Sequence, residues 1–181
     1  MRHFSFTDWL VAFGAATLMA AGIAVAADQA YAAPAQDKIK AQIKHGTLFV
    51  AGTEADDEIA LRLRAGYPGM LEVVTQDGPV GHNLRRDRFD EIVVGANGGD
   101  DLVRIDEANG VFTDTERTTL AGGGGNDDLR GGGRVETFLG GADDDSVDGN
   151  QGADVALLGS GDDSFTWDPG DGSDVVEGEL G

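Results

Sequence analysis

A nine-residue period organises the last third of the chain and constrains its fold more than any other feature. From Gly122, five consecutive units of nine residues run to Thr166, and each has an acidic residue sixth and an apolar residue eighth. The sixth positions are Asp127, Glu136, Asp145, Asp154 and Asp163. The eighth positions are Leu129, Phe138, Val147, Ala156 and Phe165. Two residue types locked to one period indicate a structural repeat.

Each unit predicts a tight turn followed by a very short strand. Its first six residues are rich in glycine, which reaches positive φ without steric cost. The next three hold one central apolar side chain that points inward. Two turns and two strands complete one coil, so the expected fold class is all-β, a right-handed parallel β-roll (β-solenoid). Turns on one edge come from alternate units, which places Asp127, Asp145 and Asp163 in one column and Glu136 and Asp154 in the other.

Columns of stacked carboxylates predict a hard cation between the turns. Unit charges about 5 Å apart repel by about 3 kcal/mol at an effective dielectric of about 20. Calcium relieves this repulsion because it accepts roughly six to eight carboxylate and carbonyl oxygens, whereas magnesium demands octahedral geometry and keeps its waters. Zinc and copper prefer nitrogen or sulfur ligands, but the repeat segment has no His and the chain has no Cys. We therefore expect Ca²⁺.

The predicted calcium ligands occupy the second, fourth and sixth positions of the turns. They are Gly123, Gly125, Asp127, Gly141, Asp143, Asp145, Gly152, Asp154, Gly159, Gly161, Asp163, Gly172 and Asp174. Asp174 joins the column of Asp154 after a two-residue insertion. Arg134 replaces a fourth-position glycine and weakens a site between turns 131–136 and 149–154. The cleanest sites are expected between turns 122–127 and 140–145, and between turns 140–145 and 158–163.

The units resemble the repeats-in-toxin, or hemolysin-type, calcium-binding family. Its consensus is Gly-Gly-x-Gly-x-Asp followed by an apolar residue between two variable ones, and the unit Gly122–Arg130 matches every fixed position. The resemblance is specific after Ala121 and weak over residues 45–120. In that earlier part, Gly52–Ile59 and Gly95–Leu102 each keep Gly first and an apolar residue eighth, with Asp57 and Asp100 sixth. The resemblance implies a module that calcium folds.

The N-terminal regions carry different signals. Residues 1–32 are expected to be a secretory signal peptide, because an uncharged run from Trp9 to Ala27 precedes a small-residue cleavage site ending at Ala32. Ala24–Ala26 offers an earlier cleavage site, and an uncleaved membrane anchor is the rival interpretation. Residues 33–44 are expected to be a polar linker with at most one helical turn.

Residues 45–120 predict short strands that cap the repeats as a degenerate β-solenoid, with a separate small β-sandwich as the alternative. The expected strands are Thr47–Ala51, Ile59–Leu63, Leu71–Val74, Ile92–Val94, Leu102–Ile105 and Thr118–Leu120. Tyr67–Gly69 and Gln76–Pro79 are expected to be turns, and Arg85, Arg86 and Arg88 to lie in a solvated loop. Residues 121–181 are the calcium-binding β-roll repeats. Trp167 is expected to close the end of the core rather than to form an exposed platform for sugars.

Charge limits the classes of partner. The formal net charge is −20, and residues 121–181 hold fifteen acidic against two basic side chains, a local charge of −13. Such a chain repels nucleic acid and anionic membrane surfaces.

Asp144–Gly149 begins like a helix–loop–helix calcium loop but has Val155 where that loop needs Glu.

The expected function is therefore that of an exported, non-enzymatic calcium-ion-binding repeat protein, extracellular or at the cell surface, with no membrane insertion after signal cleavage. Its role is structural or surface-associated, with an unidentified glycan or protein partner. The alternative is a fragment of a larger secreted enzyme, toxin or adhesin that uses the repeats as a calcium-triggered folding module.

Overall fold

The computed structural model describes residues 37–178. The expected signal peptide, residues 1–32, lies outside the described residues. From Lys38 onward the chain clusters into one compact unit. Apart from the single 3-10 turn η1 (Arg86–Arg88), the regular elements of the described part are β-strands, so the all-β class is confirmed. Within this part, no helix has the length and apolar character needed to cross a membrane.

The strands are short and follow the branched and apolar segments of the sequence. They are β1 (Lys40–Lys44), β2 (Thr47–Ala51), β3 (Glu58–Arg64), β4 (Tyr67–Thr75), β5 (Gly78–Val80), β6 (Glu91–Gly98), β7 (Leu102–Asp106), β8 (Arg117–Gly124), β9 (Asp128–Arg130), β10 (Glu136–Ala142), β11 (Ser146–Asp148), β12 (Val155–Ser160), β13 (Ser164–Thr166) and β14 (Val175–Glu177).

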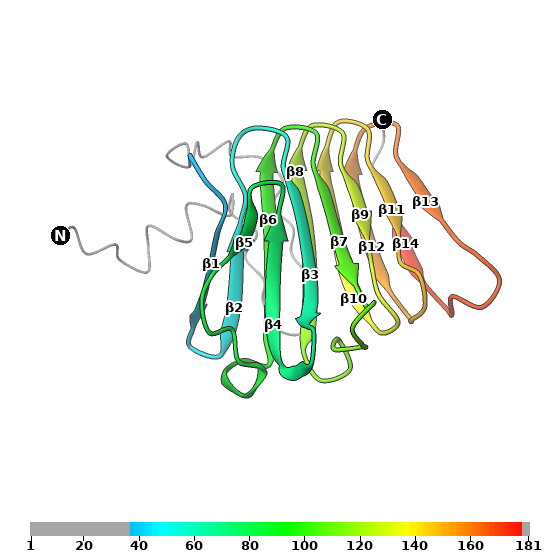
Figure 1. The fold of residues 1–181 in the computed structure, drawn as a ribbon. Helices are drawn as coiled ribbons and strands as arrows, with labels where there is room; N and C mark the ends of the chain where they lie inside the picture. The colour runs from blue at the N-terminus through cyan, green and yellow to red at the C-terminus, as the bar shows by residue number, and fades with distance from the viewer. Residues whose placement is uncertain (1–36, 179–181) are drawn as a thin grey trace. The chain divides into compact units, whose positions relative to one another are not determined.

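These strands build two seven-stranded sheets (Figure 1). One sheet has the order β1-β2-β6-β8-β10-β12-β14, and the other has the order β13-β11-β9-β7-β3-β4-β5. From β6 onward, consecutive strands alternate between the two sheets. The strands β2, β6, β8, β10, β12 and β14 pair in parallel, as do β3, β7, β9, β11 and β13. Antiparallel pairing is confined to β1–β2, β3–β4 and β4–β5.

The register reproduces the sequence period. Thr137 pairs with Val155, and Val147 pairs with Phe165, so each residue lies beside the one two units later. The offset is larger in the first coils, because the hairpin β4–β5 with η1 is inserted between β3 and β6 and the loop 107–116 between β7 and β8. The nine-residue unit is therefore one strand and one turn, and two units return the chain to the same sheet.

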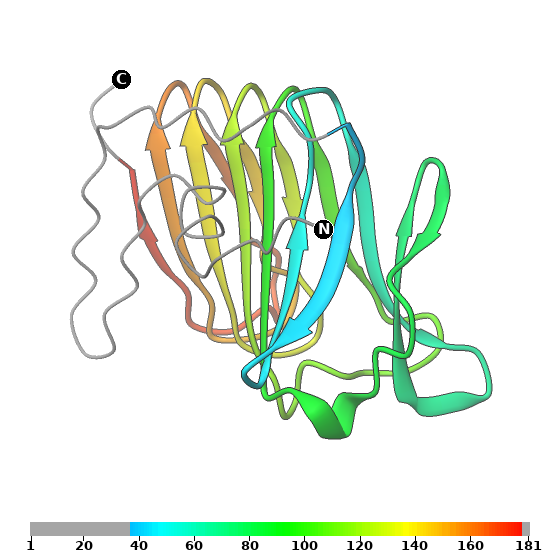
Figure 2. The ribbon, with the colours of Figure 1, turned by 90° about the vertical axis from the view of Figure 1, so that its left-hand side faces the viewer.

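The alternation creates two edges, which run along the top and bottom of Figure 1 and are also visible in Figure 2. We call the top one the upper edge. It consists of turns 52–57, 96–101, 122–127, 140–145 and 158–163. The lower edge consists of the turn 65–66 and segments 81–90, 107–116, 131–136, 149–154 and 167–174. The insertions leave the roll from the lower edge, and only the turn 76–77 of the hairpin β4–β5 reaches the upper edge, where Gln76 Nε2 donates to Asp57 Oδ1 at 3.3 Å. The five stacked turns of the upper edge themselves contain no insertion.

One hydrophobic core lies between the sheets. The eighth-position side chains of Leu129, Phe138, Val147 and Ala156 are fully buried, and Phe165 packs partly against the same core. Burial of a large apolar side chain stabilises a fold by roughly 1.5–3 kcal/mol. The core continues into β2, β3, β6 and β7, and β8 crosses the expected boundary at residue 120. The expected capping region, residues 45–120, and the expected repeat region, residues 121–181, therefore share one core.

Other sequence expectations also need correction. The expected linker 33–44 includes strand β1, which pairs antiparallel with β2 and extends the sheet. Tyr67–Gly69 opens strand β4 instead of forming a turn. Trp167 is 56% exposed and does not close the core. Arg86 does not lie in a solvated loop, because its guanidinium binds Glu116, whose side chain is only 2% exposed.

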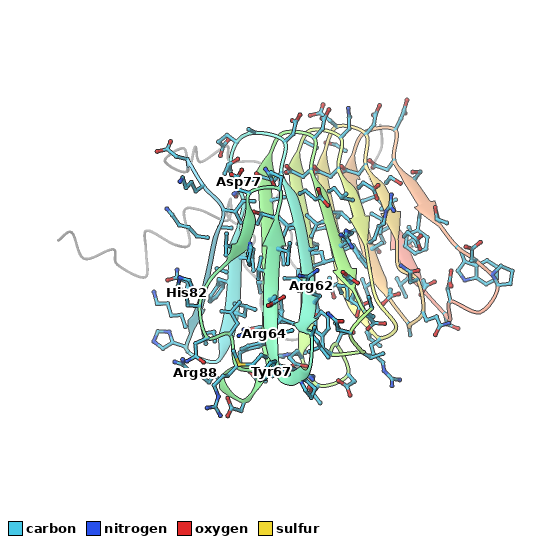
Figure 3. The ribbon with its side chains drawn as sticks, in the orientation of Figure 1. Arg62, Arg64, Tyr67, Asp77, His82 and Arg88 are labelled. Atoms are coloured by element: carbon cyan, nitrogen blue, oxygen red, sulfur yellow. The ribbon has the colours of Figure 1, made fainter. Side chains whose placement is uncertain are left out.

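Ion pairs connect the inserted hairpin β4–β5 to strand β3. On β3, Arg62 and Arg64 lie 3.3 and 3.7 Å from the carboxylate of Glu72 on β4. Arg64 also stacks 5.1 Å from the ring centroid of Tyr67, and Figure 3 labels these basic and aromatic side chains beside the hairpin. The pairs are part-exposed, and each contributes at most about 1 kcal/mol. The basic side chains of the first coil are thus engaged with the hairpin.

Close stacking of the upper-edge turns predicts that two neighbouring strand-end glycines respond differently to substitution. Gly141 has a φ of +131°, and an added Cβ would lie 2.1 Å from the Gly123 carbonyl oxygen. An added Cβ on Gly124 meets nothing within 4 Å. Gly141→Ala should lower the free energy of unfolding by more than about 2 kcal/mol, and Gly124→Ala should change it by less than about 1 kcal/mol. Denaturant unfolding of both full-length variants in one buffer tests this, and equal losses would contradict the stacking.

Candidate metal centre

A column of carboxylates runs through all five turns of the upper edge. We call Asp57, Asp101, Asp127, Asp145 and Asp163 the upper column. In each turn but the last, the backbone N–H donates to the carboxylate of the next turn, over distances of 2.7 Å for the first pair and 2.9 Å for the other three. The expected stacking of Asp127, Asp145 and Asp163 is confirmed. The column also contains Asp57 and Asp101, which the predicted ligand set omitted.

The second coil corrects a register prediction. Leu102 pairs with Asp128, so Asp101 stands beside Asp127 in the sixth position. Counting from Gly95 had placed Asp100 there, which is wrong by one residue. Asp100 instead takes the fifth position, where its Oδ1 accepts from the Asn126 N–H at 2.8 Å. Alignment of Gly99-Asp100-Asp101 with Gly125-Asn126-Asp127 was the signal that could have fixed the register.

The second oxygen of these buried carboxylates lacks a partner. Asp101, Asp127 and Asp145 are each 2% exposed, and their Oδ2 atoms are buried without a hydrogen bond. A buried acceptor left unsatisfied costs about 1–3 kcal/mol, and more when it is charged. Native structures rarely leave such atoms without a protein group, a water or an ion. Three orphaned oxygens in one column therefore point to a ligand.

Backbone oxygens converge on the same positions. An added Cβ on Gly140 would lie 2.5 Å from Asp145 Oδ2 and 2.1 Å from the Leu158 carbonyl oxygen of the next turn. At Gly52, the corresponding distances are 2.8 Å to Asp57 Oδ2 and 2.2 Å to the Ala96 carbonyl oxygen. A carboxylate and a carbonyl oxygen thus lie beside a first-position glycine, in the space that a Cβ would fill. At Gly52 that carboxylate oxygen also accepts the Thr53 N–H at 2.6 Å. Mixed carboxylate and carbonyl oxygens form the ligand set that calcium prefers.

The predicted second- and fourth-position residues of the upper edge share the expected backbone. Positive φ angles are found at Gly123, Gly125, Gly141, Asp143, Gly159 and Gly161. The structure therefore brings together nine of the thirteen predicted ligand residues, namely these six with Asp127, Asp145 and Asp163. The other four, Gly152, Asp154, Gly172 and Asp174, lie on the lower edge.

The lower edge carries a shorter column of the same kind. The Glu136 N–H donates to Asp154 Oδ1 at 2.7 Å, and the Asp154 N–H donates to Asp174 Oδ1 at 2.9 Å. The prediction that Asp174 joins Asp154 is confirmed. Glu136 and Asp154 are 1% and 0% exposed, and Glu136 Oε1 and Asp154 Oδ2 have no hydrogen-bond partner. We call Glu136, Asp154 and Asp174 the lower column.

Burial shifts the titration of five column carboxyl groups towards neutral pH. Burial is the largest cause of each shift, and it raises the pKa of Asp101 to about 8 and the pKa values of Asp145 and Glu136 to about 7. It likewise raises the pKa values of Asp127 and Asp154 to about 6. The backbone N–H bonds lower these values, and neighbouring carboxylates raise them. Near neutral pH, a proton or a cation therefore stabilises these five groups.

Solvent reaches the upper column from outside. A hollow of about 440 Å³ is lined by Asp56, Asp57, Asp100 and Asp101, among other residues. Its lining is acidic, so it attracts cations towards the buried carboxylates. The hollow belongs to the first three turns of the edge, and the third of them, 122–127, opens the nine-residue repeats.

Comparisons with protein-family models, with curated proteins and with solved structures find no match. Within residues 37–178, no group of three or more His, Cys, Asp or Glu side chains is placed to hold one metal ion. A site on either edge would therefore have to combine at most two carboxylates with backbone oxygens, as the geometry at Gly140 allows. The residues present fit calcium in this manner.

The raised pKa values predict how stability depends on pH when metal is removed. The folded chain binds more protons than the unfolded chain, whose Asp and Glu groups titrate near about pH 4. This stabilisation is fully present below about pH 4 and is lost as the pH rises through the folded values of about 6 to about 8. Thermal unfolding in excess chelator should show a melting temperature that falls between about pH 5 and about pH 8. Asp145→Asn should flatten the profile, and a melting temperature that rises with pH would contradict it.

Proposed function

We propose that this chain is an exported calcium-binding protein, not an enzyme, and that its two sheets form a right-handed parallel β-roll whose edges bind Ca²⁺. The observation that carries the proposal is the set of buried carboxylate oxygens without partners in Asp101, Asp127, Asp145 and Asp154. Each of these side chains already has one oxygen bonded to a backbone N–H, so its position is fixed before any ion binds.

The roll architecture is supported by the strand order. Consecutive strands alternate between two sheets, and parallel neighbours are two units apart in sequence. Such a chain advances by one strand spacing, about 4.8 Å, with each coil. Identical turns therefore stack directly over one another, which is the arrangement that the calcium-binding repeats resembling this chain are expected to have.

The upper column supplies the main sites. Asp127, Asp145 and Asp163 would contribute carboxylate oxygens, and the turns that carry them would contribute carbonyl oxygens. The bound ion supplies positive charge that cancels the repulsion between stacked carboxylates. Asp145 has a carboxylate neighbour on both sides, so its removal affects two intervals between turns, whereas removal of Asp163 affects one.

Calcium binding couples to folding because the chain is strongly acidic. Residues 121–181 carry a local charge of −13, and each unit there contributes only one or two apolar side chains to the core. At about ten times its dissociation constant, an ion adds about 1.4 kcal/mol of stability per site. Several sites would suffice to fold a marginally stable domain. The role that fits is a structural or surface-associated protein that folds after export, and the exposed Trp167 favours a surface partner.

Calcium titration of the full chain tests the proposal. Asp145→Asn should raise the calcium concentration at the midpoint of folding by about tenfold, because it removes a charged ligand but keeps the oxygen that accepts the Asp127 N–H. Circular dichroism and intrinsic fluorescence measure the midpoint. Asp162→Asn is the matched control, since it removes the same charge from an exposed neighbour of the column.

Three outcomes of this titration count against the proposal. They are an identical signal in calcium and in chelator, equal midpoints for Asp145→Asn and Asp162→Asn, and full replacement of calcium by magnesium. Magnesium should fail because the stacked turns offer irregular oxygen sets and not the octahedral set that it demands.

A further inference from the structure

The loop 107–116 packs against the turn 131–136 of the lower edge. Packing and hydrogen bonds hold the centre of the loop, residues 112–116, in place. Phe112 is fully buried in the core, and Arg86 donates to the Phe112 carbonyl oxygen and to Glu116 Oε1, both at 2.7 Å. Between these anchors lies Thr113, which is 4% exposed. The position of the Thr113 side chain is therefore determined by packing and hydrogen bonds on either side of it.

Three buried oxygens without well-formed hydrogen bonds are found in this loop and in the turn that it contacts, namely Glu107 Oε1, Thr113 Oγ1 and Glu136 Oε1. Gly132 lies beside both carboxylates: its N–H donates to Glu136 Oε2 at 3.0 Å, and an added Cβ on it would lie 3.0 Å from Glu107 Oε1. A hydrogen-bonding interaction with the Thr113 hydroxyl lowers the pKa of the Glu136 carboxyl, against the larger effect of burial.

We propose that Glu107, Thr113 and Glu136 form a calcium site that fastens the loop 107–116 to the lower edge. It deepens the proposed function but differs from the sites of the repeat turns, because two of its three side chains come from an insertion outside the nine-residue period. The oxygens are two carboxylates and a hydroxyl, which suit a hard divalent cation and not a transition metal.

The charges around the site favour a cation. Glu107 and Asp154 both raise the pKa of Glu136 through their negative charge, so the repulsion around it is not compensated. The nearby Arg86 is engaged by Glu116, Asp114 and the Phe112 carbonyl oxygen. Arg134, which the sequence predicts to weaken a site between turns 131–136 and 149–154, is exposed, while Glu136 is buried.

A shared proton is the competing explanation. Two buried carboxyl groups around one glycine can also be neutralised by protonation, since burial disfavours the charged form. A proton would satisfy Glu107 and Glu136 without fastening the loop in response to metal. The two explanations differ in whether calcium changes the dynamics of the loop at constant pH.

Hydrogen exchange of the full chain, compared in calcium, magnesium and chelator at one pH, separates these explanations. Calcium should slow exchange in residues 107–116 of the unsubstituted chain by about tenfold or more beyond the change that it causes in the core strands β8 and β10, and magnesium should not. Glu107→Gln should abolish this protection and remove one bound calcium in calorimetry. Thr113→Val, which keeps the shape of the side chain, should raise the calcium needed for loop protection several-fold.

Matched control variants distinguish an effect of the loop site from a general effect of substitution. Glu177→Gln and Thr119→Val change the same residue types outside the site and should behave as the unsubstituted chain does. Loop protection that is unchanged in both site variants, or that follows pH but not calcium, would overturn the proposal. If Glu107→Gln does not fold, Thr113→Val alone decides.

The repeat sites are tested separately. Asp145→Asn should weaken calcium binding at the upper edge while loop protection persists. If calcium protects the loop although the upper edge binds no calcium, the proposed function of the repeats is rejected and the loop site is supported. If calcium binds at the upper edge but does not change hydrogen exchange in the loop, the loop site is rejected and the proposed function of the repeats is supported.

Discussion

Repulsion between stacked like charges is the constraint on which the rest of this structure depends. In-register parallel strands place each residue about 4.8 Å from its copy two units later. The register that aligns Phe138 with Ala156 in the core therefore also aligns Asp127 with Asp145 at the edge. Packing and charge cannot be optimised separately, because any slip that separates the carboxylates also turns apolar side chains out of the core. Neutralisation is the remaining solution, by protons at acidic pH or by cations at neutral pH.

The sixth-position acids also have a structural role that does not require charge. In Asp127, Asp145 and Asp163, one oxygen accepts a backbone N–H from the preceding turn of the column, which holds successive turns together where strand pairing stops. An asparagine would serve this bond equally well, as Asn126 does in the fifth position, where its Oδ1 accepts the Asp144 N–H. The second, unpartnered oxygen is what distinguishes the acid. Its burial is unfavourable unless something positive binds there, so the acid has a benefit only in the presence of a ligand.

The sequence predicted those contacts that repeat at a fixed offset. The burial of Leu129 and Val147 and the stacking of Asp145 on Asp163 follow from the period of nine. The return of Asp174 to the lower column follows once a two-residue insertion is allowed for. Contacts outside the period could not be found in this way. Asp100 and Asp101 are adjacent acids, and the sequence of this turn alone does not show which of them occupies the sixth position. The pairing of β7 with β9 decides it. Glu107 and Thr113 lie in an insertion and therefore have no periodic signal. The antiparallel pairing of β1 with β2 also lies outside the period.

The position of the insertions explains why the two edges differ. The upper edge has no insertion in five turns, so its column extends unbroken from Asp57 to Asp163. On the lower edge, Thr118 occupies the place that precedes Glu136, and the loop 107–116 occupies the place of a repeat turn. Glu136 therefore begins its column without a carboxylate before it. The loop places the Glu107 carboxylate beside Gly132, whose N–H donates to Glu136, so negative charge near Glu136 comes from the insertion and not from the repeat.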